Sequence, residues 1–152
     1  MADSTAAAER ISLDQRLCLA LYTASRAMTA RYRPLLSELG LTYPQYLVMV
    51  LLWEQGARSV GQVGSRLSLE SSTLSPLIKR LEAMGLVTRA RDAHDERSVM
   101  IGLTSEGNAL EQRAAGVTAE ICGATGLPLR EQARLVAELR ELAVQLQAST
   151  TG

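Results

Sequence analysis

Apolar residues recur every three or four positions along most of the chain, the spacing that places them on one face of an α-helix. The first such segment runs from about 13 to 39, and Gly40 follows it as a C-terminal cap. A second helix is predicted to begin at Thr42, which forms a capping box with Gln45, and to end at Gly56. Residues 47–53 are apolar on nearly every side, so this helix is predicted to lie in the centre of the core.

Two further helices follow with a break between them. Ser59 and Gln62 repeat the capping-box spacing and predict a short helix that ends near Ser68. The next helix is expected from about 70–72 to 84 and is closed by Gly85. Pro76 is expected near its first turn, because a proline deeper in a helix would kink it. The inward face of this helix is apolar at Leu74, Leu77, Ile78 and Leu81.

The apolar period changes to two after Gly85, which predicts strands over 86–91 and 98–103 joined by a polar loop. Thr104 is the predicted N-cap of a helix reaching about residue 125, and a last helix follows Pro128 to residue 147. The expected fold is mainly α with a small β-wing, a winged helix-turn-helix. In this single domain, 1–10 form a disordered tail, 41–103 the DNA-binding region, and 11–40 and 104–147 the dimerisation helices.

Charge and length exclude several classes of protein. The 152 residues carry 16 basic and 16 acidic side chains, and the longest apolar run, 46–53, is too short for a bilayer span of ~18 residues. The N-terminus lacks the basic and apolar regions of a signal peptide, so a cytoplasmic protein without a membrane partner is expected. Residues 58–97 nevertheless contain seven basic and five acidic residues, and a locally basic surface can bind phosphates.

The second helix of a helix-turn-helix lies in the major groove of DNA. Serines and a threonine at the start of this helix can alternatively act only as capping residues, and an Asp-x-Arg loop can alternatively form only an exposed ion pair. An arginine at the tip of a wing can enter the minor groove, and Asp95 could hold the Arg97 guanidinium in place. The expected DNA-binding residues are Glu70, Ser71, Ser72, Thr73 and Ser75 on the helix, Lys79 and Arg80 further along it, and Arg89, Arg91, Asp95 and Arg97 on the wing.

Residues 95–104, Asp-Glu-Arg-Ser-Val-Met-Ile-Gly-Leu-Thr, resemble the wing signature of the MarR family of bacterial transcriptional regulators. The resemblance implies a homodimer joined by the terminal helices, with Arg97 in the minor groove and 71–84 as the recognition helix. The implied partner is a double-stranded, pseudo-palindromic DNA operator.

Two cysteines without a CxxC motif, together with one histidine, cannot form an ordinary zinc site, so no metal and no cofactor are expected. Taken alone, Cys18 is typical of a core thiol, and Tyr32 and Tyr43 are typical of packing residues. The pattern from 17–22 through 25–29 to 41–46, however, closely resembles the organic-hydroperoxide-resistance regulators, a branch of the MarR family. This resemblance implies that Cys18 senses peroxide and that both phenols donate hydrogen bonds to its sulfur, which favours the thiolate.

Cys122 resembles the second cysteine of the two-cysteine members of this branch, which implies a resolving disulfide with Cys18 of the partner subunit. The alternative is that Cys122 is a core residue. Cys18 and Tyr32 are 14 residues apart on one predicted helix, about 21 Å along its axis, and therefore cannot touch within it. If they interact, the tyrosine comes from the other subunit.

The predicted function is a repressor that releases its operator when an organic hydroperoxide oxidises Cys18. A MarR-type regulator that responds to a phenolic ligand without cysteine chemistry is the alternative. A thiol peroxidase is a third possibility, but no other residue supports turnover, so the protein is expected not to be an enzyme.

Overall fold

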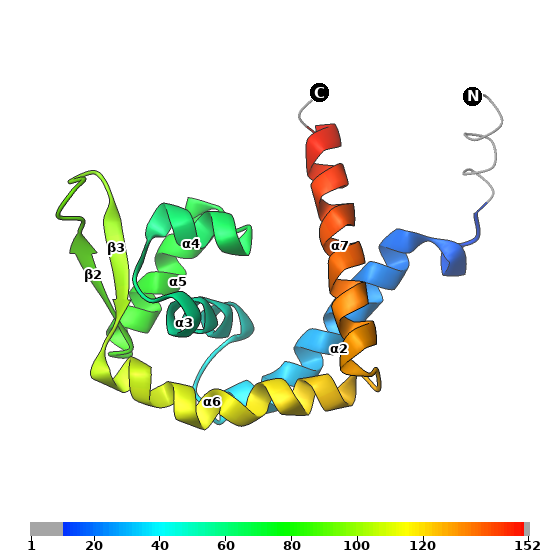
Figure 1. Ribbon diagram of the computed structural model, residues 1–152, viewed down its shortest axis with the longest axis horizontal. Helices are drawn as coiled ribbons and strands as arrows, with labels where there is room; N and C mark the ends of the chain where they lie inside the picture. The colour runs from blue at the N-terminus through cyan, green and yellow to red at the C-terminus, as the bar shows by residue number, and fades with distance from the viewer. Residues whose placement is uncertain (1–10, 151–152) are drawn as a thin grey trace. The chain divides into compact units, whose positions relative to one another are not determined.

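The computed structural model describes residues 11–150 and divides the chain into two compact units, one ending at Val117 and the other beginning at Thr118. The expected tail at 1–10 lies outside the described residues. The first unit, shown in Figure 1, contains η1 (Leu13–Gln15), α2 (Leu17–Ser37), α3 (Tyr43–Gln55), β1 (Arg58–Ser59), α4 (Val60–Leu67), α5 (Ser71–Ala83), β2 (Val87–Arg91), β3 (Val99–Leu103) and most of α6 (Ser105–Ala124). The predicted class, mainly α with a small β-wing, is confirmed.

The first predicted helix is divided in two. Arg16 has an extended backbone (φ −78°, ψ 125°), which separates η1 from α2. The prediction of one helix over 13–39 was therefore wrong at its start, where the residues are exposed and no tertiary contact favours a continuous helix. Its end is as predicted, because Gly40 adopts φ 71° and the Leu41 N–H donates to the Leu36 carbonyl at 3.0 Å.

The core forms around α3. Both predicted capping boxes are present: Thr42 with Gln45 begins α3, and Ser59 with Gln62 begins α4. Because α3 is apolar on most sides, it can contact α2, α4, α5 and β3 at once. The side chains in this core that are at most 2% exposed include Val48, Met49, Leu52, Val63, Leu74, Ile78, Leu81 and Ile101.

The turn between α4 and α5 depends on a close backbone approach. Ser68 adopts the left-handed conformation (φ 55°), and the Leu69 N–H donates to the Gly64 carbonyl at 2.9 Å. A Cβ at Gly64 would lie 2.9 Å from the Leu69 carbonyl oxygen, so the turn requires a glycine there. Pro76, expected near the first turn of α5, is instead its sixth residue. That prediction was wrong: the Ser72 carbonyl, one turn earlier, loses its helical donor, and Ser72 lies on the exposed face, where water can replace it.

The sheet has three strands in the order β1-β3-β2, not two. β2 and β3 form the predicted antiparallel wing, with Val87 opposite Leu103 and Arg91 opposite Val99. The third strand, β1, pairs Arg58 with Ile101 and Ser59 with Met100. Two residues have no periodicity, so β1 could not be predicted from the pattern. Of the residues in β3, only Ile101, at the centre of the strand, is fully buried, because its side chain points into the core.

Side-chain hydrogen bonds both cap the start of α6 and join it to the rest of the winged helix. The Thr104 hydroxyl accepts the Gly107 N–H at 3.0 Å, as expected of the N-cap, and donates to the Gly85 carbonyl at 2.6 Å. The Trp53 indole donates to the Gly107 carbonyl at 2.9 Å. Further along α6, the Arg113 guanidinium donates to the Glu38 carbonyl at the end of α2.

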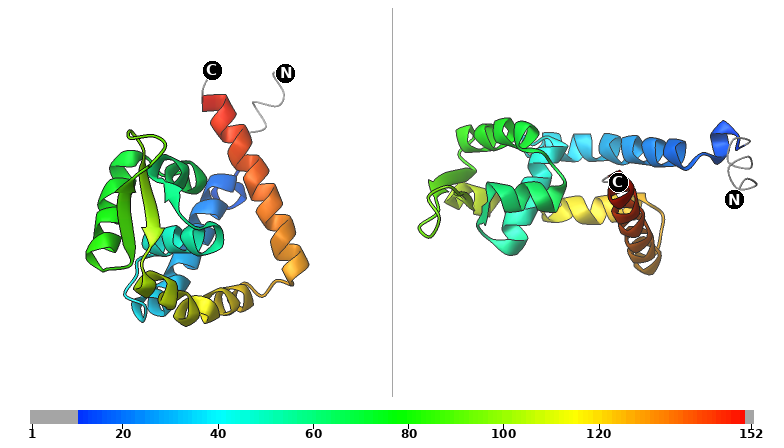
Figure 2. Two further views of the ribbon diagram at one scale, coloured as in Figure 1. Left: turned by 60° about the vertical axis from the view of Figure 1, so that its left-hand side comes forward. Right: turned by 90° about the horizontal axis from the view of Figure 1, so that it is seen from above.

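The second unit contains the end of α6 and all of α7 (Leu129–Thr150). Figure 2 shows α7 as one uninterrupted helix, and it continues past residue 147, where the sequence predicted an end. The Gln132 amide donates to the Cys122 and Leu127 carbonyls and closes the turn between the two helices. Large apolar side chains on α7, such as Leu135, Val144 and Leu146, are exposed. None of the helices in the described part of the chain is both long and apolar enough to span a membrane.

Candidate nucleic-acid interface and thiol site

The exposed face of α5 carries the predicted groove-reading residues. Leu74, Leu77, Ile78 and Leu81 turn inward, so the intervening residues face solvent. Glu70 is the N-cap residue of α5, although its side chain makes no capping hydrogen bond. The exposed side chains are Ser71, Ser72, Thr73, Ser75, Lys79 and Arg80. Short hydroxyl groups at a helix N-terminus are compatible with both capping and phosphate contact.

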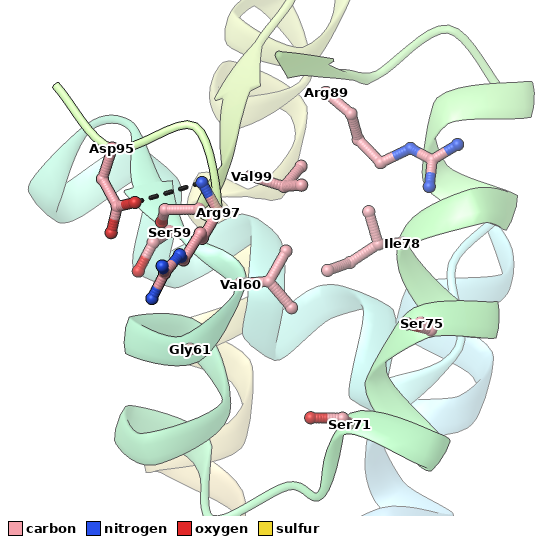
Figure 3. Close-up of a pocket in the computed structure, with 11 residues that line it drawn as sticks. Ser59, Val60, Gly61, Ser71, Ser75, Ile78, Arg89, Asp95, Arg97 and Val99 are labelled. Carbon is pink, nitrogen blue, oxygen red and sulfur yellow. Dashed lines mark hydrogen bonds between the residues drawn. The ribbon is translucent and has the colours of Figure 1, made fainter. Parts of the chain in front are cut away.

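The wing loop is closed by main-chain hydrogen bonds between Asp92 and Ser98 and between Ser98 and Asp95. The Asp95 carboxylate accepts the main-chain N–H of Arg97 at 3.1 Å, shown as the dashed line in Figure 3. The expectation that Asp95 holds the Arg97 guanidinium was wrong: among the described residues no ion pair joins the two side chains, and the Asp95 carboxylate instead caps the turn through the main-chain N–H two residues ahead. Arg97 itself is exposed, at the tip where the prediction placed it.

A hollow of about 470 Å³ separates the wing from α4 and α5 (Figure 3). It brings together the predicted Ser71 and Ser75 of α5 with Arg89, Asp95 and Arg97 of the wing. Its other walls are Ser59, Val60 and Gly61 at the start of α4, together with Ile78, Ser98 and Val99. The sequence reasoning missed the start of α4 as part of this surface, although the capping box at Ser59 had located that helix end.

Arg89 is bound by a second side chain. Its guanidinium donates to both carboxylate oxygens of Glu82, with Nε–Oε2 at 3.1 Å and Nη2–Oε1 at 3.0 Å. The hydrogen bond from Arg89 lowers the pKa of Glu82, and Glu82 in turn raises the pKa of Arg89. Figure 3 shows Arg89 directed toward α5. This bidentate pair connects β2 of the wing to the end of α5 and offsets the charge that Arg89 would offer to phosphate.

The predicted sensing cysteine is exposed in this chain. Cys18 lies in the first turn of α2, and Tyr32 lies in the same helix, as the sequence predicted. At 1.5 Å per residue, their 14-residue separation is about 21 Å along the axis. Cys18 is therefore not a core thiol of this chain, and Tyr32 of the same chain does not reach it.

Tyr32 and Tyr43 do lie together. Their ring centroids are 4.9 Å apart, and a third ring, Tyr46, lies 5.6 Å from Tyr32. Burial raises the pKa of Tyr43, with a smaller contribution from Tyr46. The phenol, which is protonated at neutral pH even at its ordinary pKa, can therefore donate a hydrogen bond over a wider pH range. Tyr46 was not predicted from the sequence to be part of this aromatic cluster. It is 4% exposed and packs edge-on against Trp53, with the ring centroids 6.4 Å apart.

Cys122 is half-buried near the end of α6, and neither cysteine forms a disulfide. Its carbonyl accepts hydrogen bonds from the Thr125 hydroxyl and the Gln132 amide. Among the described residues, no three His, Cys, Asp or Glu side chains are grouped closely enough to hold a metal ion.

Known proteins resemble most of this chain. The family described as "Transcriptional regulator SarA/Rot" matches residues 30–113. The HTH-type transcriptional regulator TtmR of Methylorubrum extorquens is 47% identical over 137 residues, which are 90% of this chain and 70% of TtmR. The organic hydroperoxide resistance transcriptional regulator of Bacillus subtilis is 46% identical over 115 residues, 76% of this chain and 78% of that protein. Reduced AbfR bound to DNA superposes with a TM-score of 0.74 at 34% identity, covering 93% of this chain and 99% of AbfR.

The winged helix with its exposed α5 and wing, together with these relatives, defines a DNA-binding transcriptional regulator. The chain belongs to the MarR-type family of such regulators that includes SarA/Rot and the organic hydroperoxide resistance regulators, which confirms the family resemblance seen in the sequence.

Proposed function

We propose that this regulator is a homodimeric repressor that binds a pseudo-palindromic operator and releases it when an organic hydroperoxide oxidises Cys18. One observation carries the proposal: an exposed cysteine and a paired phenol occupy the same helix, too far apart to meet within one chain. An antiparallel second copy of α2 brings Cys18 of one subunit to Tyr32 and Tyr43 of the other.

Exposed apolar residues support the second copy. Leu13, Leu17 and Met28 are 65%, 57% and 39% exposed in the first unit. On α7, Leu135, Leu139 and Leu146 are also exposed at helical spacing. Apolar stripes of this kind are stabilised when they are buried against a partner. The proposed interface is therefore formed by the terminal helices, 11–40 and 104–147.

The proposed chemistry begins with the Cys18 thiolate. Its sulfur attacks the terminal oxygen of the hydroperoxide, the O–O bond breaks, and the sulfur becomes a sulfenic acid, oxidised by two electrons. The alkoxide that leaves takes a proton from water and becomes an alcohol. Tyr43 supports this step because a phenol that donates to sulfur stabilises the thiolate, and burial raises the pKa of Tyr43 further above its ordinary value.

Cys122 is the proposed resolving residue. Its thiol attacks the Cys18 sulfenic acid of the partner subunit, and a disulfide and one water molecule form. Cys122 is half-buried rather than sealed in the core, which is compatible with this role. AbfR, at 33% identity, has been described in a disulfide-formed state as well as in the reduced DNA-bound state.

The proposed operator contact uses α5 in the major groove and Arg97 in the minor groove. Two α5 helices in a dimer would read half-sites about 34–36 Å apart. Lys79, Arg80 and Arg91 are exposed and would contact phosphates. A disulfide at the interface changes the separation of the two α5 helices. A difference of ~3 kcal/mol against DNA lowers affinity more than a hundredfold.

The test measures DNA binding by wild type, Cys18→Ser and Cys122→Ser, using a DNA fragment selected by the reduced wild type. tert-Butyl hydroperoxide should release wild type and leave Cys18→Ser bound. Peptide mapping should find the Cys18–Cys122 linkage in oxidised wild type and a sulfenic acid in Cys122→Ser.

Equal release of wild type and Cys18→Ser would remove Cys18 from the mechanism. Release of both by a non-oxidising phenol would instead identify a ligand-responsive regulator.

A further inference from the structure

The turn between α6 and α7 is closed by hydrogen bonds that converge on one main-chain carbonyl, that of Cys122. The Thr125 hydroxyl donates to this oxygen at 2.7 Å, and the Gln132 amide donates to it at 3.2 Å. The last four carbonyls of a helix have no helical donors. The Gly126 N–H, which a continuing helix would direct to Cys122, donates to the Gly123 carbonyl instead. Two side chains therefore satisfy an oxygen that the end of α6 leaves open.

Gln132 connects this carbonyl to α7. Its Nε2 also donates to the Leu127 carbonyl at 2.8 Å, so one amide in the first turn of α7 binds both the end of α6 and the turn. The Leu127 N–H donates to the Thr125 hydroxyl at 3.2 Å and completes the network. Within Leu129–Thr150, every residue except Gln132 and Leu142 is exposed. The half-buried Gln132 amide is therefore a principal attachment of α7 to the end of α6.

The network acts on the residue that the proposed disulfide uses. A disulfide holds its sulfurs about 2.05 Å apart and its Cα atoms within about 7 Å, so it restrains the main chain of Cys122 as well as its sulfur. That restraint reaches Gln132 through the Cys122 carbonyl. Gly126, at φ 68° and with nothing within 4 Å of an added Cβ, leaves room for the turn to bend when the carbonyl moves.

We infer that Gln132 is a positioning residue that transmits the oxidation of Cys122 to α7. The inference rests on the proposed function and specifies the contact through which the disulfide acts; the redox step is the one given above. In the reduced protein, the two hydrogen bonds of Gln132 set the direction in which α7 leaves the turn. When the disulfide moves the Cys122 carbonyl, α7 follows it. Because α7 belongs to the proposed dimer interface, its movement changes the separation of the two α5 helices.

The test compares DNA affinity before and after oxidation by tert-butyl hydroperoxide, using the DNA fragment selected by the reduced wild type. The measured quantity is the ratio of reduced to oxidised affinity, which a loss of stability common to both states does not change. This ratio should exceed a hundred for wild type. Gln132→Ala should form the Cys18–Cys122 disulfide to the same extent, and its ratio should be about tenfold smaller, the factor expected when hydrogen bonds to two carbonyls are lost.

Two further variants separate the hydrogen bonds from the side chain itself. Thr125→Val removes the other donor to the Cys122 carbonyl and should lower the ratio about threefold. Gln132→Lys keeps a donor, and a cation is favourable near the end of α6, so this variant should keep most of the ratio. Gln145→Ala is the matched control in the same helix, because its amide donates only to Glu141 of α7, and it should keep the full ratio.

A wild-type ratio in both Gln132→Ala and Thr125→Val would overturn the role of Gln132, and so would an equal loss in Gln145→Ala. Failure of Gln132→Ala to form the disulfide while Cys18 is still oxidised would also overturn it, because Gln132 would then place the thiol rather than transmit its oxidation. If wild type forms no Cys18–Cys122 disulfide, or keeps its affinity when oxidised, the proposed function fails, and this inference fails with it.

Discussion

Gly107 offers a sharp test of how α6 is attached to the winged helix. A Cβ added there would overlap the Leu86 carbonyl oxygen and lie 3.1 Å from the Leu86 carbonyl carbon and 3.3 Å from Leu103 Cδ2. Two of these atoms belong to the backbone at the root of β2, so a rotamer change cannot relieve the contact. The helix start must move instead, and the Trp53–Gly107 hydrogen bond is strained with it.

Gly107→Ala is therefore expected to destabilise the protein by about 2 kcal/mol, within the range for an overpacked core, despite the better helix propensity of alanine. Gly116→Ala is the matched control in the same helix, since nothing lies within 4 Å of its added Cβ. It should stabilise by about 0.5–1 kcal/mol. For a chain of this size, Gly107→Ala should lower Tm by roughly 4–8 °C and Gly116→Ala raise it by about 2 °C.

The measurement is thermal unfolding followed by circular dichroism at one fixed protein concentration, because association shifts Tm. The two variants differ only in which glycine receives the methyl group, so helix propensity cancels in the comparison. If Gly107→Ala were as stable as Gly116→Ala, α6 would not be held against Leu86 as described.

Three further predictions concern the wing and its root. Arg89→Glu should weaken DNA binding. If the pair positions the wing, the double variant Glu82→Arg with Arg89→Glu should recover most of the affinity for DNA. A double variant that binds DNA as weakly as Arg89→Glu alone would instead indicate that Arg89 contacts phosphate. Arg89 lowers the pKa of Glu82, so the stabilisation that the pair provides is present above the unfolded pKa near 4.3 and is lost as pH falls through the lower folded pKa. The Tm of wild type minus the Tm of Glu82→Gln should therefore be positive at pH 6 and vanish in acid. A Tm difference that does not change with pH would count against the pair. Thr104→Ala removes the N-cap of α6 and the hydrogen bond to Gly85, so it should lower the free energy of unfolding in urea by about 1–2 kcal/mol. Thr104→Ser keeps the hydroxyl and should keep most of the wild-type stability.

The helix boundaries could be predicted because their causes are local. A capping box joins residues three apart, so Thr42 with Gln45 and Ser59 with Gln62 located the starts of α3 and α4 from the sequence alone. Glycines with positive φ at positions 40, 56 and 85 marked the helix ends for the same reason. The inward stripe of α5 followed from its period, and the separation of Cys18 from Tyr32 followed from the rise of a single helix.

The tertiary structure decided what depends on distant backbone meeting in space. β1 exists because Arg58 and Ser59 find the free edge of β3, and two residues leave no periodic signal. The pairing of Arg89 with Glu82 could not be predicted, because it forms only when the turn at Gly85 brings β2 against the end of α5. The Asp95 carboxylate could accept a hydrogen bond either from the main-chain N–H or from the guanidinium of Arg97. The conformation of the folded loop determines that the main-chain N–H is the donor. Local hydrogen bonds are specified by neighbouring residues in the sequence, whereas these contacts depend on where each turn places the next element.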